Sequence, residues 1–513
     1  IQAKKGVNNW WKKTGEAPEI LKEALAEKSK IQLRKYYFSK GWFNAETSYD
    51  IKTTENRRAS VDYFVKTGTP YVIDSINLKI STPSIDSLYR QNLINGSLIT
   101  TGKQYDENMY ESERSRLSEQ LRNLGYYHFG QDYISFALDT VNTNYKVNTD
   151  LIIQNRIIRN EDSVTRVPFK VYKIKEVNIF TDNRFENKDA ETTDSLTYKN
   201  YNLYSNGELN YRPKAITDAV FITKGGLFRD LDRTRTYKYL SELSVFKYPN
   251  IEYIENVSDT TLTANIYLVP KKKYSLNFSP EISTSNIQTI GFSFSTGLLI
   301  RNVFKGAETF EVGAIGSIGA SKDNRNPEDP FFDINEIGAN MRLTIPRVFF
   351  PINTDKVIPK FMSPSTRISA AATSQRNIGL DKQSLTGVLS YNWYPSKKVT
   401  NTFDLFNIQY VKNLNIDNYF KVYQNSFNRL NDIAQSINYI DNTQILDIPG
   451  EADAFINDVM TENTILSPQD DNYINVNNIS QRKNRLTENN LIISTSFNYI
   501  KTKRENLLDN DFS

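Results

Sequence analysis

The sequence predicts α+β repeats followed by an antiparallel transmembrane β-barrel, and three observations support this fold class. The first half, up to Pro270, repeats a loose pattern of helices and strands. After Pro270 helical periodicity ends, and apolar and polar residues alternate in one segment after another, as in strands whose two faces meet different surroundings. The 513 residues include 31 Tyr and 28 Phe, and this aromatic excess, with frequent Asn, Ser and Thr, favours strands.

The repeated unit combines an amphipathic helix, which ends in Gly plus an aromatic residue, with flanking strands. In the first module, 1–70, the helix begins at Pro18 and ends before Gly41, as Pro and Gly prefer at helix boundaries. Two alternating strands follow in NAETSYDIKTTE and RRASVDYFVKTG. The first half is therefore expected to hold modules built from a helix and a small sheet.

Two further modules follow the same plan. The second, 71–168, opens with the strand YVIDSINLKI and closes with the strand pair YISFALDTV and KVNTDLIIQN. The third, 169–271, begins with YKIKEVNIF and takes an insertion rich in Asn, Asp and Thr at 181–211. We expect all three to be plain α+β modules without an active site. Their turn glycines are Gly41, Gly125, Gly225 and Gly226.

Residues 272–513 are predicted to form about eight strands, the N-terminal part of a barrel. The first is KYSLNFSPEIS, and the alternation recurs at 290–295, 308–320, 337–345, 385–393 and 491–499. Several segments reach about ten residues, the length that a tilted membrane strand needs, whereas globular strands average about five or six. In ETFEVGAIGSIGA the residues expected to face hydrocarbon are Phe310, Val312, Ala314 and Ile318.

A soluble sandwich would also alternate, because one face of its sheets meets a core and the other meets water. The connections favour a barrel: YPSKKVTNT is a short turn, whereas 415–488 is a long polar external loop. Within this loop FNRLNDIAQSI has helical spacing, which fits either a docking surface or a helix over the barrel mouth. Its apolar positions are Phe427, Leu430, Ile433, Ala434 and Ile437.

Composition excludes several classes of function. The net charge is only +4 and the basic residues are scattered, so nucleic acid is not an expected partner. Cysteine is absent and His128 is the single histidine, which removes thiolate chemistry, most catalytic triads and His-based metal sites. We therefore expect no enzyme, with no catalytic residue, cofactor or metal. No apolar run of about 18 residues exists, which excludes a helical membrane span.

Three such modules ending directly at a barrel resemble the Omp85 superfamily, whose periplasmic modules are called POTRA domains. The resemblance covers nearly the whole chain. Its local carriers are ITKGGLFRDLDRTRTYKYLSELSVFKYPNIEY, similar to the POTRA pattern of Gly-rich turn, helix and aromatic strand start, and RNVFKGAETF, similar to the N-x-F-x-G-G/A-E segment early in the barrel. The residues that match this second motif are Asn302, Phe304, Gly306 and Glu308.

Within the BamA/TamA family, three modules instead of five resemble the TamA branch, and NNWWKKTGEAPEILKEALAEKSKIQLRKYYFSKGWFNAE is similar to the start of its lipid-anchored relatives, TamL. The TamL resemblance implies a lipidated Cys upstream of Ile1. Relatives close a barrel of about sixteen strands and carry an RGF loop motif. Here about eight strands are visible and RGF does not occur, so we expect the second half of the barrel to lie beyond the given residues.

The resemblance implies a translocation and assembly factor of a Gram-negative-type outer membrane, with POTRA modules in the periplasm. Its expected partners are unfolded outer-membrane proteins as clients, outer-membrane lipid, and an inner-membrane-anchored TamB-like protein or other assembly subunits. A two-partner-type secretion pore and a non-catalytic outer-membrane scaffold are the alternatives. Assembly would proceed by insertion of client strands at a lateral barrel seam, which needs no covalent chemistry.

An exposed strand edge offers unpaired N–H and C=O groups to an incoming extended segment. The first predicted strand is the candidate lateral gate, because Pro280 within it cannot donate to a ladder and so favours an edge. A strand end at a membrane interface would explain Pro280 equally well. The candidate gate residues are Tyr274, Leu276, Asn277, Phe278, Pro280 and Ile282.

Overall fold

The computed structural model describes residues 20–54, 58–160, 163–183, 193–256, 258–284, 288–321, 332, 334–376, 381–396 and 398–502. Pro18 and the WW-containing start of the chain lie outside these residues. The chain divides into two compact units. The first comprises Ile1–Ile174, Gly225–Leu231 and Glu255–Leu262, and the second comprises Lys175–Lys224, Asp232–Ile254 and Thr263–Ser513.

The first unit begins with a helix and a hairpin, in the order that the sequence predicts. Helix α2 (Glu23–Ser39) is followed by Gly41, whose φ of 90° suits glycine. A Cβ at Gly41 would come within 2.7 Å of the Tyr105 carbonyl oxygen. Both the positive φ and this close contact therefore exclude a larger residue. Strands β1 (Glu46–Thr53) and β2 (Ala59–Lys66) then pair antiparallel.

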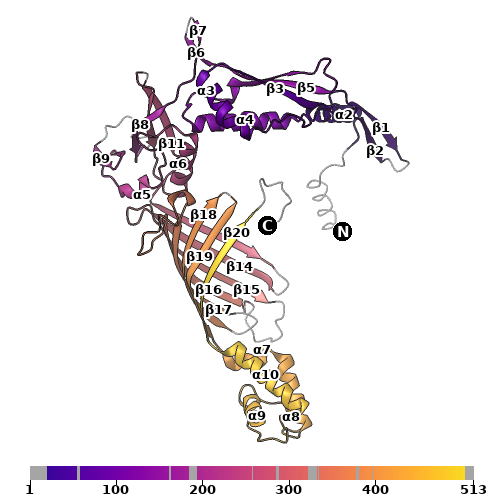
Figure 1. Cartoon of the computed structure of the whole chain (residues 1–513). Coiled ribbons are helices and arrows are strands. Elements are labelled where there is room, and N and C mark those ends of the chain that lie inside the picture. The colour runs from indigo at the N-terminus through magenta and orange to yellow at the C-terminus, as the bar shows by residue number, and fades with distance from the viewer. Residues whose placement is uncertain are drawn as a thin grey trace, which may run out of the picture. The chain divides into compact units, whose positions relative to one another are not determined.

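A three-stranded sheet follows in the same unit, with β5 between a parallel β3 and an antiparallel β4. Helix α4 (Glu107–Asn123) lies along this sheet (Figure 1), and its buried Leu117 and Leu121 join the core around Leu151 and Ile153. The hairpin of β6 and β7 was not predicted. The bounds are β3 (Val72–Ile80), α3 (Pro83–Leu88), η1 (Tyr89–Leu93), η2 (Ile94–Gly96), η3 (Gln131–Tyr133), β4 (Ile134–Asp139), β5 (Lys146–Ile153), β6 (Arg156–Asn160) and β7 (Ser163–Val167).

The third module has a five-stranded sheet in the order β11-β12-β8-β10-β9. Part of the predicted insertion at 181–211 belongs to this sheet, since β10 pairs in parallel with β8 and antiparallel with β9. Alternate burial of Tyr201 and Leu203 explains why this polar stretch extends the sheet. The bounds are β8 (Lys173–Phe180), β9 (Asp194–Tyr198), β10 (Tyr201–Ser205), α5 (Pro213–Thr217), α6 (Asp230–Glu242), β11 (Asn250–Asn256) and β12 (Thr261–Tyr267).

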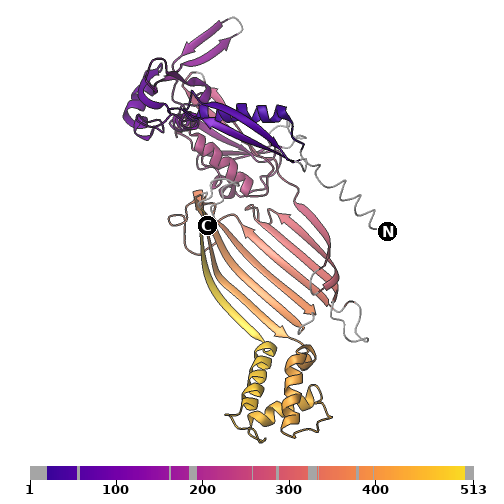
Figure 2. The same cartoon turned by 90° about the vertical axis from the view of Figure 1, so that its right-hand side faces the viewer.

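Eight antiparallel strands, β13 to β20, form one curved sheet in which each strand pairs with its sequence neighbour (Figure 2). The predicted fold class, α+β modules followed by an antiparallel sheet of about eight strands, is confirmed. No segment in β17 or β19 is named among the predicted strands, and for β17 the reason is that its alanines weaken the apolar alternation. The bounds are β13 (Tyr274–Ser283), β14 (Gln288–Arg301), β15 (Thr309–Ser321), β16 (Ile334–Ile345), β17 (Ser365–Arg376), β18 (Lys382–Ser396), β19 (Val399–Asn413) and β20 (Asn490–Lys501).

The segment between β19 and β20, predicted as an external loop, is helical. Its helices share a core around Tyr419, Leu430, Phe455 and Val476. The predicted apolar stripe of α8 belongs to this core, so its own neighbouring helices cover it, and neither a docking partner nor the barrel mouth is needed. The bounds are η6 (Ile416–Asn418), α7 (Tyr419–Val422), α8 (Gln424–Ser436), α9 (Gly450–Met460) and α10 (Asp471–Thr487).

None of the helices among the described residues is long and apolar enough to cross a membrane. One further short helix, η5 (Lys360–Met362), lies in the connection from β16 to β17.

Candidate functional site: an open sheet edge and a braced turn

Strand β13 is an edge of the eight-stranded sheet. Over its ten residues it pairs with β14 and with no other described strand, and every one of its residues is exposed. All six candidate gate residues lie on it. Leu276, Phe278 and Ile282 are 76%, 64% and 72% exposed, which is unusual for large apolar side chains in a regular strand. Among the described strands, β13 therefore has a backbone edge without a partner, and it carries exposed apolar side chains.

Pro280 stands inside β13, opposite Phe294 of β14, and the strand continues to Ser283. The alternative interpretation, that Pro280 marks the strand end, is therefore wrong. An interior position on an edge strand is where a residue without an N–H is tolerated. The other edge is β20, which pairs only with β19 among the described strands and is also exposed along its whole length.

The register gathers apolar side chains on one face of the sheet. Leu298, Val312 and Met341 lie side by side on β14, β15 and β16. The four residues that the sequence assigns to hydrocarbon, Phe310, Val312, Ala314 and Ile318, alternate along β15 and so share this face. Further exposed members of the face are Leu276, Phe278, Phe294, Ile337, Ile368, Leu385, Phe406, Ile408, Leu491 and Ile493. Such a continuous exposed apolar surface is far larger than soluble monomers present.

The opposite face of the sheet is polar and lined by small residues. One row across it runs from Asn277 through Gly297 and Gly313 to Asn340. A Cβ at Gly313 would come within 2.5 Å of the Asn340 side-chain oxygen, so the glycine makes room for the amide. One apolar and one polar face on strands of 10 to 15 residues match a sheet between lipid and water.

The RNVFKGAETF motif forms the turn between β14 and β15. Asn302 donates its backbone N–H to the Glu308 carbonyl over 2.7 Å, and its side-chain oxygen accepts from Ala307 N over 3.1 Å. Asn302, Lys305 and Ala307 have positive φ angles of 56°, 61° and 62°, which closes the chain tightly. Phe304 is 53% exposed and takes no part in the turn's interior. Three of the four motif residues thus have a structural role in one turn.

Glu308 is the buried centre of this turn, with a side chain only 3% exposed. Gly306 N donates to one carboxylate oxygen over 2.8 Å, and Arg347 Nη2 donates to the other over 2.8 Å. Burial alone would raise the pKa of the Glu308 carboxyl, but hydrogen bonds from its own N–H, from Arg347 and from Gly306 outweigh it and lower this pKa. Glu308 is therefore held as a carboxylate.

Gly306 contacts the same carboxylate so closely that no side chain fits there. A Cβ on Gly306 would lie 2.1 Å from Glu308 Oε1. Arg347 Nη1 also donates to the Gly306 carbonyl over 3.1 Å, so one guanidinium holds both residues. Sequence reasoning found Gly306 and Glu308 through the motif, but not Arg347. The only sequence signal for Arg347 was a basic residue two positions after an alternating strand.

The predicted turn glycines do not gather at one place. Gly125 has a φ of 99°, and its carbonyl accepts from Tyr172 N over 2.9 Å. Gly225 has a φ of 81°, and Gly226 accepts from Ile174 N over 2.8 Å. Gly225 and Gly226 thus bond within the third predicted module, whereas Gly125 of the second accepts from Tyr172 of the third. Among the described residues, no group of three or more His, Asp and Glu side chains could hold a metal ion.

No protein-family model and no curated protein matches this chain. Several solved structures are similar to it, including these three. BamA from Haemophilus ducreyi lacking POTRA domains 1–3 is 10% identical with a TM-score of 0.40, and the match covers 85% of this chain and 61% of that one. BamA POTRA3–5 from Haemophilus influenzae is 11% identical with a TM-score of 0.28, covering 47% and 79%. CdiB from Acinetobacter baumannii is 9% identical with a TM-score of 0.25, covering 77% and 72%.

This chain thus spans 61% of the length of the H. ducreyi BamA chain.

Proposed function

We propose that this chain is an outer-membrane assembly factor of the Omp85 superfamily, in which POTRA-like modules collect unfolded outer-membrane proteins and β13 pairs with their strands. The exposed edge of β13 carries this proposal. Along this edge the N–H and C=O groups have no partner among the described strands, and such groups are those that β-augmentation uses. Natural proteins usually cover or charge such an edge. β13 has a charged residue only at Glu281.

The sheet's two faces support a place in the outer membrane. In hydrocarbon each backbone polar group has to be bonded within the protein, so an open edge there favours any segment that completes the ladder. The side chains of β13 that flank the edge, such as Leu276 and Phe278, suit a strand that stays in lipid while its partner changes. A client strand would satisfy the backbone without removing those side chains from the membrane.

The α+β modules supply surfaces for client capture on the periplasmic side. In the first of them, β1 and β2 form a sheet of only two strands, and Tyr63 and Phe64 on β2 are exposed. Edges and aromatic side chains of this kind suit extended, unfolded clients. On the sequence resemblance we assign the chain to the TamL-like branch, with a lipid anchor upstream and a TamB-like or other assembly subunit as its partner.

A secretion pore is the second candidate, and the small residues of the polar face favour it. Gly297 and Gly313 lie next to each other in one row, which leaves space on the side that would face a lumen. A pore moves a soluble partner along that face, whereas an assembly factor engages clients at the edge. The two functions therefore differ in the part of the sheet that the substrate contacts, which is the polar face for a pore and the β13 edge for an assembly factor.

Cross-linking from β13 tests the assembly function. The given sequence has no cysteine, so Asn277→Cys provides a single thiol on the edge strand. The chain is reconstituted in lipid vesicles and presented with an unfolded outer-membrane protein that carries one cysteine in its terminal strand. We expect a disulfide between Asn277→Cys and the client, and a register that shifts by two residues when the client cysteine is moved by two.

The matched control is Ser293→Cys, on β14, whose neighbours on both sides are occupied by Glu281 and Ser317. It should give no client disulfide. Equal cross-linking at both positions, or none at Asn277→Cys, would overturn the assembly function. Capture of a soluble exported protein from the polar face, with no strand register, would favour the pore.

A further inference from the structure

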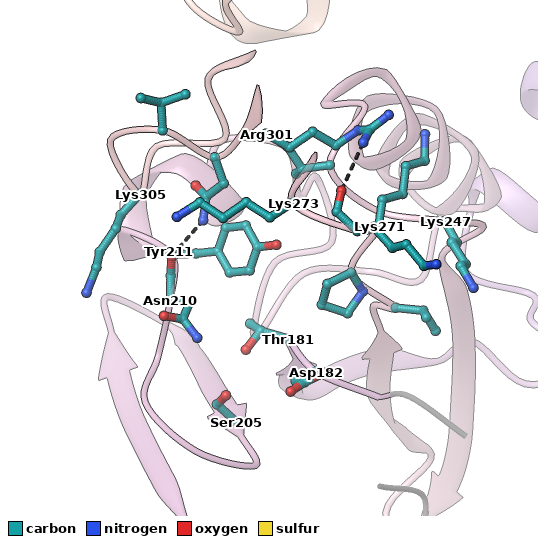
Figure 3. A pocket seen from close by; sticks show the side chains of 16 residues that line it. Thr181, Asp182, Ser205, Asn210, Tyr211, Lys247, Lys271, Lys273, Arg301 and Lys305 are labelled. Carbon is teal, nitrogen blue, oxygen red and sulfur yellow. Dashed lines mark hydrogen bonds between the residues drawn. The ribbon is translucent and has the colours of Figure 1, made fainter. Parts of the chain in front are cut away.

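A hollow of about 730 Å³ lies where the third module meets the first two strands of the sheet, within the second unit. This volume is in the range of roughly 300–1,000 Å³ that is usual for small-ligand sites. Its walls carry six cationic side chains, and Figure 3 shows five of them with labels around the hollow. The six are Lys247, Lys271, Lys272, Lys273, Arg301 and Lys305.

These cations come from separate segments that the backbone holds together. Lys247 precedes β11, and its N–H donates to the Val269 carbonyl over 2.8 Å. Lys271 N donates to the Val245 carbonyl over 2.9 Å, and Arg301 N to the Lys273 carbonyl over 2.8 Å. Main-chain bonds therefore fix the backbone positions from which these side chains extend.

Among the described residues, little in the pocket neutralises these charges. None of the six makes an ion pair with any residue that the structure describes, and Asp182 is the one carboxylate among the lining residues. Six like charges around one hollow repel each other, because each lies near the next in a partly enclosed space. A bound anion would relieve this repulsion.

Arg301, the last residue of β14, uses only one of its guanidinium nitrogens in a hydrogen bond to a described residue. Its Nη1 donates to the Lys272 carbonyl over 2.9 Å, which orients the guanidinium at the pocket wall (Figure 3). Its Nε is shielded from solvent and has no hydrogen-bond partner among the described residues, so it cannot itself reach a ligand in the hollow. The guanidinium would therefore contact phosphate oxygens through its terminal amino groups, which suit such oxygens.

We propose that this pocket binds a phosphate-bearing ligand, with Arg301 as the principal contact and the surrounding lysines as counter-charges. The site lies directly before the start of β13 and at the last residue of β14. If the proposed membrane placement holds, this end of the strands is at the bilayer boundary, within reach of anionic lipid headgroups. A soluble phosphate or diphosphate offers the same chemistry.

Calorimetric titration of the purified full chain in uncharged detergent tests the proposal. The probes are inorganic pyrophosphate, a short-chain phosphatidylglycerol and, as the zwitterionic comparison, a short-chain phosphatidylcholine. The pocket variant changes three exposed lysines, Lys247→Gln, Lys273→Gln and Lys305→Gln. The control makes the same charge change elsewhere in the unit, with Lys356→Gln, Lys382→Gln and Lys412→Gln.

We expect one or both anionic probes to bind at least about tenfold more tightly to the control than to the pocket variant, with affinity falling as salt is raised. Pyrophosphate alone would identify a soluble anion, and phosphatidylglycerol alone a headgroup; both outcomes support the site. Arg301→Lys, which keeps the charge but loses the fork, should weaken binding on its own.

Equal affinity of the pocket variant and the control, or no binding of either anionic probe, would overturn the site. Binding of phosphatidylcholine as tight as that of phosphatidylglycerol would do the same. The outcome is independent of the client cross-linking at Asn277→Cys, since anion binding in detergent needs no client. If anion binding fails while client cross-linking succeeds, only the anion site is wrong. If cross-linking fails while anion binding succeeds, only the assembly function is wrong.

Discussion

Arg347 donates to the Glu308 carboxylate over 2.8 Å, although 39 residues separate the two along the chain. Arg347 follows the end of β16, and Glu308 directly precedes β15, so the ion pair joins two connections at the same end of the sheet. The Glu308 side chain is only 3% exposed, so the carboxylate of this ion pair is buried. Buried carboxylates need such a partner.

Replacing Arg347 should therefore destabilise the sheet. Arg347→Met removes the partner and leaves an uncompensated buried carboxylate, for which we expect a loss of about 3 kcal/mol in the free energy of unfolding. Urea titration of the chain in vesicles measures this change. The control is Arg342→Met, whose contact with Glu311 is 3.4 Å long and exposed on both sides, and which should cost less than about 1 kcal/mol. Equal losses of unfolding free energy in the two variants would contradict a stabilising role for the Arg347–Glu308 ion pair.

The glycine of the same turn should be equally intolerant. Gly306→Ala places a methyl group on the Glu308 carboxylate, so we expect a loss of about 1–3 kcal/mol. Gly387→Ala is the matched control, because a Cβ at Gly387 meets nothing within 4 Å. The same urea titration compares the two. A neutral Gly306→Ala would mean that the carboxylate can move aside without cost.

The assignment of the sheet's faces can be tested with charge. Val312→Arg should cost about 2–4 kcal/mol if Val312 lies near the bilayer midplane. Ser317→Arg is on the polar face, where its register partner is Glu336, and should be tolerated. Unfolding in vesicles measures both. Fluorescent labels on Val312→Cys and Ser317→Cys should differ in the same sense, with only the first quenched by a lipid-soluble agent; identical quenching would refute the face assignment.

His128 should make the stability of the first unit depend on pH. Its Nε2 lies 2.9 Å from Glu255 Oε2, and Tyr172 donates to the same carboxylate. Burial and the nearby positive charge of Arg156 outweigh the attraction of Glu255 and lower the pKa of His128 below its ordinary value of 6.5. The same burial and the hydrogen bond to Glu255 raise the pKa of Tyr172 to about 12.

Because the folded pKa of His128 is the lower one, the unfolded chain takes up the proton first. Stability should therefore fall as pH is lowered from 6.5 toward the folded pKa, and it should be fully present above 6.5. Urea unfolding of the chain between about pH 5 and pH 8 measures this slope. His128→Gln should flatten the slope in this window; an unchanged slope would assign the pH dependence to other groups.

The alternation of apolar and polar residues located six of the eight strands of the large sheet, because side chains of a strand point to opposite faces with a period of two. That rule placed Val312 and Ile318 on one face without any knowledge of their neighbours. Helix ends were predicted in the same local way at Gly41 and Gly125, where only glycine readily adopts the positive φ that closes the turn. These features depend on residues a few positions apart.

Only the tertiary structure determined which strands and charges meet. Arg347 and Glu308 are brought together by the pairing of β15 with β16, and no local pattern encodes a contact over that separation. Lys247 and Lys305 line one hollow for the same reason, although the sequence shows only scattered basic residues. Strand register and the closure of long loops decide these contacts, because they depend on the free energy of the whole packed unit and not on the preference of any segment.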